Sequence, residues 1–111
     1  MIKRDPTPFL PLTPAVLHIL LSLSDGPRHG YGIAKESADR THGEIKLGPG
    51  TLYGTLGRLV TAALVSEADG GEGADDRRRF YQITPLGREV LTLEAQRLAE
   101  VVSAARAKAV I

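Results

Sequence analysis

The sequence contains no cysteine and no tryptophan, and it has only two phenylalanines and three tyrosines among its 111 residues. The absence of cysteine excludes disulfide bonds and thiolate metal sites, which agrees with the reducing conditions of the cytosol. His18, His29 and His42 have no spacing for a shared metal, so we expect each of them to have a core or capping role. No metal or other cofactor is therefore expected.

Long apolar runs are also missing. The apolar stretch at residues 15–23 is interrupted by His18 and is far too short to span a bilayer. It ends at Asp25-Gly26-Pro27 and not at the small residues of a signal-peptide cleavage site. We therefore expect a soluble cytoplasmic protein.

Neither a large excess of charge nor an enzyme motif is present. The net charge is only +1, whereas nucleic-acid-binding proteins usually have a basic surplus. Gly30-Tyr31-Gly32 is followed by Lys35 where a dinucleotide-binding motif requires glycine, and neither a Walker motif nor a nucleophile motif occurs. We therefore expect no enzyme, and any basic surface must come from the distribution of charges.

Helix-start signals divide the chain into segments. Thr13-Pro14, Gly48-Pro49 and Thr84-Pro85 each place proline at a first helical position, where its missing N–H is not needed. The periodic patterns predict helices over about 14–24, 31–40, 49–62 and 85–111, and strands over 64–68 and 79–83. This order indicates a mainly α fold with a small β-hairpin (α+β). We predict an extended arm at residues 1–11, a winged helix-turn-helix at 12–84 and a dimerisation helix at 85–111.

The third predicted helix has two contrasting faces. Its buried stripe follows helical spacing and consists of Leu52, Leu56, Leu59, Val60 and Ala63. Gly50, Gly54 and Gly57 lie opposite this stripe. Because each interior glycine costs about 0.5–1 kcal/mol relative to alanine, three of them require a reason. Either DNA approaches the backbone closely, or another helix of the same protein crosses tightly there.

Three helices followed by a glycine-rich hairpin predict a winged helix whose third helix enters the major groove. The predicted DNA-binding residues are Pro49, Gly50, Thr51, Tyr53, Gly54, Thr55, Arg58, Arg77 and Arg78. Tyr53 either contacts DNA or covers the core edge, and we expect Tyr31 to pack against the core. The acidic residues Glu67, Asp69 and Glu72 of the hairpin argue against DNA contact.

The last predicted helix has a coiled-coil seam, because apolar residues recur at alternating steps of four and three. The seam consists of Leu91, Ala95, Leu98, Val102, Ala105 and Ala109. A second apolar strip contains Leu86, Val90, Leu93 and Val101. Since one strip can dock on the domain while the other contacts a partner, we predict a homodimer.

Three blocks of the sequence resemble the PadR family of transcriptional regulators. Residues 29–33 (HGYGI) are similar to its HGYxI segment, residues 50–59 (GTLYGTLGRL) to its PGTLYPxLxRLE recognition helix, and residues 78–87 (RRFYQITPLG) to its RKYYxLTxxG strand and turn. The resemblance extends from about Leu12 to Leu93. The single, short C-terminal helix resembles that of the compact subtype of the family.

This resemblance implies a repressor that binds a palindromic operator in double-stranded DNA as a homodimer, relieved in some members by a small lipophilic or phenolic effector. Two departures bear on this. Gly54 stands where many members have proline, and the absence of tryptophan gives no support for an aromatic drug sandwich at the dimer interface. The alternative is a winged-helix protein-interaction module without sequence-specific DNA binding.

Overall fold

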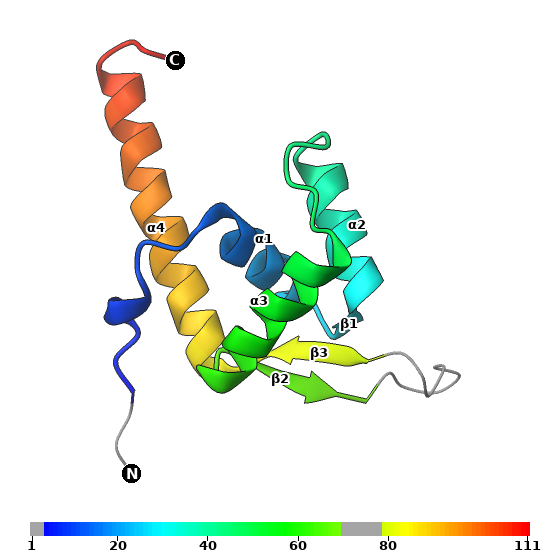
Figure 1. The fold of residues 1–111 in the computed structure, drawn as a ribbon. Helices are drawn as coiled ribbons and strands as arrows, with labels where there is room; N and C mark the ends of the chain where they lie inside the picture. Colours follow the sequence, from blue (N-terminus) through cyan, green and yellow to red (C-terminus); the bar gives the residue numbers. More distant parts are fainter. Residues whose placement is uncertain (1–3, 70–78) are drawn as a thin grey trace.

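The structure is a computed structural model in which residues 4–69 and 79–111 are described. In order along the chain lie a 3-10 helix (Thr7–Phe9), α1 (Pro14–Leu23), β1 (Arg28–His29), α2 (Gly30–Arg40), α3 (Pro49–Thr61), β2 (Val65–Ala68), β3 (Phe80–Ile83) and α4 (Pro85–Ala107). The three shorter helices lie together above the sheet, and α4 runs past them to the C-terminus (Figure 1). The expected winged-helix architecture, mainly α with a small sheet, is confirmed.

Side-chain caps fix where the helices begin. The Thr13 hydroxyl accepts the Val16 N–H at 3.3 Å, and the Thr84 hydroxyl accepts the Gly87 N–H at 3.0 Å. His29 Nδ1 accepts the Gly32 N–H at 3.1 Å at the start of α2, which confirms a capping role for this histidine. Each cap satisfies one of the amides that a helix N-terminus leaves without an intrahelical partner.

The sheet contains a strand that the sequence did not predict. Its order is β1-β3-β2, and β3 pairs antiparallel with both neighbours, so that Arg28 lies opposite Tyr81 and Val65 opposite Ile83. β1 has two residues, which is too short to show the period-two pattern of a strand. Its pairing with β3 brings His29 and the start of α2 next to the hairpin.

All four helices and two strands of the sheet contribute to one hydrophobic core. The buried members are Ile19, Leu20, Leu23, Ile33, Leu52, Leu56, Leu59, Leu64, Val65, Tyr81, Val90 and Leu91. Leu52, Leu56 and Leu59 of the predicted stripe face inward, whereas Val60 remains 38% exposed. Ala63 is exposed and lies beyond the end of α3 with φ of 65°. The opposite face of α3 is left for other contacts.

The N-terminal segment is more structured than the predicted extended arm. It contains the 3-10 helix, and Arg4 Nη1 donates to the Ala62 carbonyl at the end of α3 at 3.0 Å. The Leu12 N–H donates to the Glu94 carboxylate of α4 at 2.6 Å. The segment therefore joins α3 to α4.

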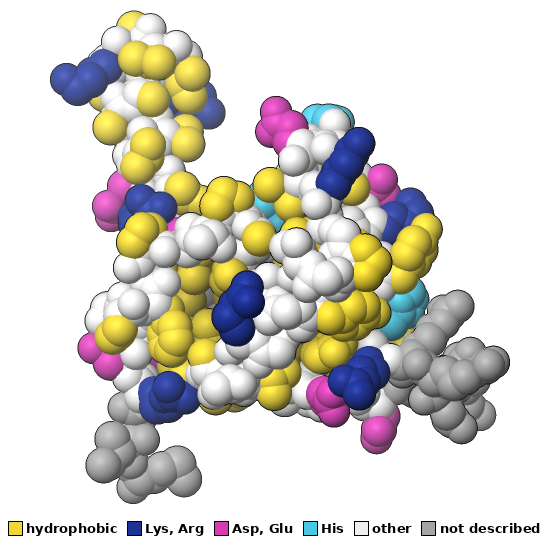
Figure 2. Space-filling model, in the orientation of Figure 1, with side chains coloured by type: hydrophobic (Ala, Val, Ile, Leu, Met, Phe, Trp, Pro, Cys, Tyr) yellow, Lys and Arg dark blue, Asp and Glu magenta, His cyan; other side chains and the backbone are white. Residues whose placement is uncertain are grey.

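The contact between the first turn of α4 and Leu64, the residue before β2, requires a glycine. A Cβ at Gly87 would overlap the Leu64 carbonyl oxygen, so the two backbones are in direct contact. Beyond Glu94 the helix leaves the domain, and its apolar side chains are visible on the projecting half (Figures 1 and 2). None of the described helices combines the length and apolar character needed to cross a membrane.

Candidate nucleic-acid interface

The outer face of α3 is the surface that a winged helix presents to DNA, and it is exposed along its whole length. Nine of its residues are exposed: Pro49, Gly50, Thr51, Tyr53, Gly54, Gly57, Arg58, Val60 and Thr61. Gly48 at the N-cap position has no side chain to cap the helix, so the first amides remain free for an anion. The helix contains no acidic residue that would repel one.

The glycines of α3 face open space. A Cβ at Gly50 or Gly57 would meet nothing within 4 Å, and one at Gly54 would meet only Arg58 Nη1, at 3.8 Å. Within the described residues, therefore, no other helix crosses this face. Of the two explanations for the glycines, a tight crossing inside the chain finds no support here.

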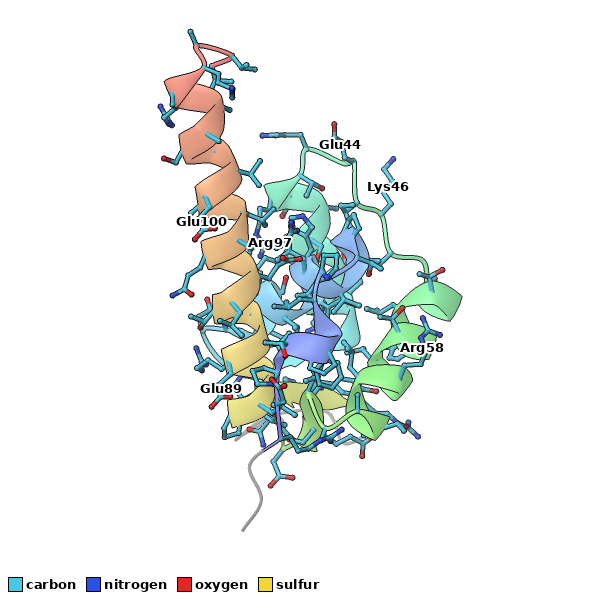
Figure 3. All side chains as sticks on the ribbon, turned by 90° about the vertical axis from the view of Figure 1, so that its left-hand side faces the viewer. Glu44, Lys46, Arg58, Glu89, Arg97 and Glu100 are labelled. Atoms are coloured by element: carbon cyan, nitrogen blue, oxygen red, sulfur yellow. The ribbon has the colours of Figure 1, made fainter. Side chains whose placement is uncertain are left out.

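Arg58 and Thr55 lie one turn apart on α3 and are hydrogen-bonded. Arg58 is exposed and points away from the core (Figure 3), and its Nη2 donates to Thr55 Oγ1 at 3.1 Å. Thr55 differs from the prediction, because it is only 4% exposed. It lies three residues after Leu52 and four before Leu59, a spacing that places it on the buried stripe. The hydroxyl of the buried Thr55 thus orients the guanidinium of Arg58.

Two tyrosines are exposed beside α3. Tyr53 is 46% exposed, and its hydroxyl lies against Gly30, where a Cβ would be only 2.5 Å away. Tyr31 is 70% exposed and stacks on His29, so it packs on a neighbouring ring and lies outside the core. The helical pattern of α2 contains the signal, because Tyr31 is two residues before the buried Ile33 and so lies on the opposite side.

The described part of the hairpin has both charges. Arg79 is exposed directly before β3, and its Nη1 lies 3.7 Å from Glu67 Oε1 on β2. Glu67 and Asp69 are also exposed. The predicted contacts Arg77 and Arg78, like Glu72, lie outside the described residues.

A polar network holds α2 against α1 behind the interface. Arg40 Nη2 donates to Glu36 at 2.6 Å and to the Ser22 hydroxyl at 3.2 Å, and its Nη1 donates to His18 Nδ1 at 3.2 Å. Burial, and then the Arg40 charge, lower the pKa of His18, which favours the neutral ring that accepts this bond.

The residues of the predicted dimer seam lie in three different environments. Leu91 is only 7% exposed in the core of its own chain, and Ala109 lies beyond the end of α4 with φ of 60°. Ala95 and Ala105 lie on the helix between them, the first exposed and the second half-buried. Leu98 and Val102 are 37% and 42% exposed, and their neighbour Val101 is 57% exposed. The free apolar surface thus lies on the projecting half of α4.

No described cluster of three or more His, Cys, Asp or Glu residues could hold a metal ion. What the described surface offers is an exposed helix face with free amides, hydroxyls and Arg58, beside a hairpin. These groups can donate hydrogen bonds to phosphates and base edges.

Comparisons with known proteins agree with this geometry. A model of the transcriptional regulator PadR-like family matches residues 17–93. The chain is 41% identical over 85 residues to the transcriptional regulator Rv3488 of Mycobacterium tuberculosis. This match covers 76% of this chain and 75% of that protein. It is 40% identical over 85 residues to an uncharacterized 37.1 kDa protein in transposon TN4556 of Streptomyces fradiae, a match that covers 77% of this chain but only 23% of that protein.

Solved structures show the same fold. A PadR family transcription regulator from Clostridium difficile superposes with a TM-score of 0.70 at 25% identity, over 85% of this chain and 96% of that one. Bacillus subtilis PadR in complex with operator DNA superposes with a TM-score of 0.62 at 20% identity, over 74% of this chain and 46% of that one.

Proposed function

The chain belongs to the PadR-like family of transcriptional regulators, and we propose that it is a repressor that binds a palindromic operator as a homodimer. Its fold is a DNA-binding winged helix. The proposal depends above all on one observation: the outer face of α3 is exposed throughout, and within the described residues no other helix crosses its glycines.

In this proposal α3 enters the major groove, which is wide enough for one helix. The free amides of Gly50 and Thr51, at the positive end of the helix dipole that begins at Pro49, receive a phosphate. Gly54 lets the backbone approach the groove wall, while Arg58 and Tyr53 supply donors. Arg77 and Arg78, which directly precede Arg79 in the sequence, extend the contact to the neighbouring backbone. Thr55 acts through Arg58.

The dimer joins two such units through the projecting half of α4. Leu98 and Val102 of two chains would cover one another there, together with Ala95 and Ala105. A single winged helix reads only a few base pairs, so specificity requires two units at fixed spacing. The half-site centres would lie about one helical turn apart or slightly more.

Footprinting on the DNA upstream of the coding sequence tests this function, followed by transcription in vitro from the protected promoter. We expect two protected half-sites and less transcript as the protein is added. The Leu98→Glu variant, with α3 intact, should protect neither half-site at the same concentration. An increase in transcript, or protection of a single half-site by a monomer, would contradict the proposal.

A further inference from the structure

The large apolar side chains that the described surface exposes fall into two groups. Leu98, Val101, Val102, Val110 and Ile111 lie at the projecting end of the chain, where the proposed dimer covers α4. The other group is Tyr31, Tyr53 and Val60, at 70%, 46% and 38% exposure. The proposed major-groove contact of α3 assigns no role to Tyr31 or Val60.

This second group lines one groove of about 590 Å³. Its walls come from the start of α2, the flank of α3 and the strands β2 and β3, with Gly57 and Arg79 among the lining residues. The groove adjoins the outer face of α3, because Tyr53 and Gly57 belong to both. A partner that covers Tyr53 and Gly57 on the outer face of α3 therefore also borders this groove.

Both tyrosine rings are held in place before any partner arrives. Tyr31 stacks on His29 with a centroid distance of 6.2 Å and an angle of 11°, and His29 meets the edge of Phe80 at 5.4 Å. His29 is itself fixed by the Gly32 N–H. Tyr53 rests against the backbone of the buried Gly30. Such fixed rings lose little conformational entropy on binding.

We propose that Tyr31 and Tyr53 form a seat for one sugar–phosphate strand of the DNA that α3 binds. When α3 lies in the major groove and the hairpin reaches the neighbouring backbone, one strand passes between them. The rings then pack against deoxyribose, and the hydroxyls donate to phosphate oxygens. At the hairpin wall of the groove, Arg79 lies 3.7 Å from the carboxylate of Glu67, so its guanidinium must turn from that carboxylate to reach a phosphate.

This inference rests on the proposed function, and its test separates the two. Fluorescence anisotropy measures the affinity of the full chain for the footprinted duplex and for an unrelated duplex at several salt concentrations. Tyr31→Phe and Tyr53→Phe should each bind both duplexes about threefold to tenfold more weakly, as expected for one lost hydrogen bond. The slope of log affinity against log salt should stay unchanged, because no charge is removed. Arg58→Ala is the matched contrast, since it should flatten that slope.

A second variant moves Tyr53 without deleting it. Gly30→Ala places a Cβ against the Tyr53 hydroxyl, at the free end of a side chain that can shift. We expect an unchanged melting temperature and affinity reduced as in Tyr53→Phe.

Three results would overturn either the proposed role of the two tyrosines or the proposed function of the chain. Wild-type affinity of Tyr31→Phe and Tyr53→Phe, with a weakened Arg58→Ala, would overturn the seat and leave the proposed function standing. A loss confined to the footprinted duplex would mean that the tyrosines read bases, which also overturns a backbone seat. A wild-type protein that binds neither duplex would instead overturn the proposed function itself.

Discussion

At the scale of single residues, Arg58 is the most direct test of how α3 is oriented. It is exposed, and its guanidinium is held over the outer face of the helix by Thr55. Arg58→Ala should weaken DNA binding by about 1–3 kcal/mol per subunit, because each chain of the proposed dimer loses one base or phosphate contact. The fold should stay intact, since Arg58 is exposed and its hydrogen bond to Thr55 stays within α3. Gel-shift titration with thermal melting checks both halves.

Arg106→Ala is the matched control, because it removes an exposed positive charge from the far end of α4. Its affinity should equal that of the wild type. Equal losses in both variants would mean that Arg58 acts only through overall charge.

Gly54 tests whether the open face of α3 exists for close approach. Gly54→Ala adds a Cβ whose nearest neighbour is Arg58 Nη1 at an ordinary 3.8 Å, so it should stabilise the helix by about 0.5–1 kcal/mol. The same methyl group should lower DNA affinity by keeping the backbone away from the groove wall. Melting temperature and affinity measured on one variant decide; an improvement in both would refute close approach at this position.

Glu94 predicts how stability depends on pH. Its carboxylate is 1% exposed and accepts from Arg97 and from the Leu12 N–H, and these bonds, led by that from Arg97, lower its pKa below the ordinary value of 4.5. A lowered folded pKa gives stability that is complete above the unfolded pKa and is lost as pH falls through the folded one. Glu94→Gln should therefore be less stable by about 1–3 kcal/mol at pH 7.

The difference from wild type should shrink as the pH falls below the ordinary pKa of 4.5 and then through the lowered pKa of the folded state, because the wild-type carboxyl is then protonated too. Urea unfolding at pH 7, 5 and 3 measures it. Glu100→Gln, at an exposed position on the same helix, should show no such dependence. A difference that is the same at all three values would contradict the charge mechanism.

At the scale of elements, the projecting half of α4 predicts the oligomeric state. Burial of Leu98 from both chains should contribute about 1.5–3 kcal/mol per side chain. Leu98→Glu introduces a charge into a desolvated seam, so this variant should be largely monomeric at micromolar concentration and lose DNA binding. Analytical ultracentrifugation beside a gel shift tests both effects.

Gln96→Glu adds the same charge at an exposed position on the opposite side of α4, and it should remain dimeric. Dimerisation of Leu98→Glu at the wild-type level would place the partner surface elsewhere.

The elements themselves were largely predictable from sequence, because proline and capping residues mark their starts. α3 was predicted over 49–62 and spans Pro49–Thr61. β1 could not be predicted, since two residues become a strand only through pairing with β3, which lies 50 residues later. The structured N-terminal segment is similar, because its bonds go to α3 and α4 and leave no local pattern.

The sequence predicted which helix face is exposed, but it did not predict the exposure of every residue on or beside that face. Arg58 and the glycines are exposed as expected, whereas Thr55 shares the buried stripe and Tyr31 lies outside the core. Both differences follow from helical spacing that the residue types obscured: threonine suggested a surface donor, and tyrosine a core ring. The seam on α4 was read as continuous, but tertiary packing buries Leu91.

At the scale of the whole molecule, the net charge is only +1, so the salt dependence of binding tests whether the arginines of the proposed interface contact phosphates. Arg58, Arg77, Arg78 and Arg79 from two chains could neutralise up to eight phosphates. The slope of log affinity against log salt should then be steep, at most about −7, and Arg58→Ala should reduce its magnitude by about 2. Anisotropy titrations between about 50 and 300 mM salt measure this slope. A slope near zero would mean that the wild type does not bind DNA through phosphates.

The backbones of Gly87 and Leu64 are in direct contact, so a change in the direction of α4 would be a rotation about this point at the base of the hairpin. From Gly87 to Ala107 the helix extends about 30 Å, so a rotation of only 10° at this pivot would displace its far end by roughly 5 Å, more than the 3.4 Å between successive base pairs. In a dimer joined at those far ends, the same small rotation would shift one recognition helix out of phase with the other along the double helix. The distance between the two recognition helices would then no longer match the distance between the two half-sites, although every side chain that touches DNA remained in place.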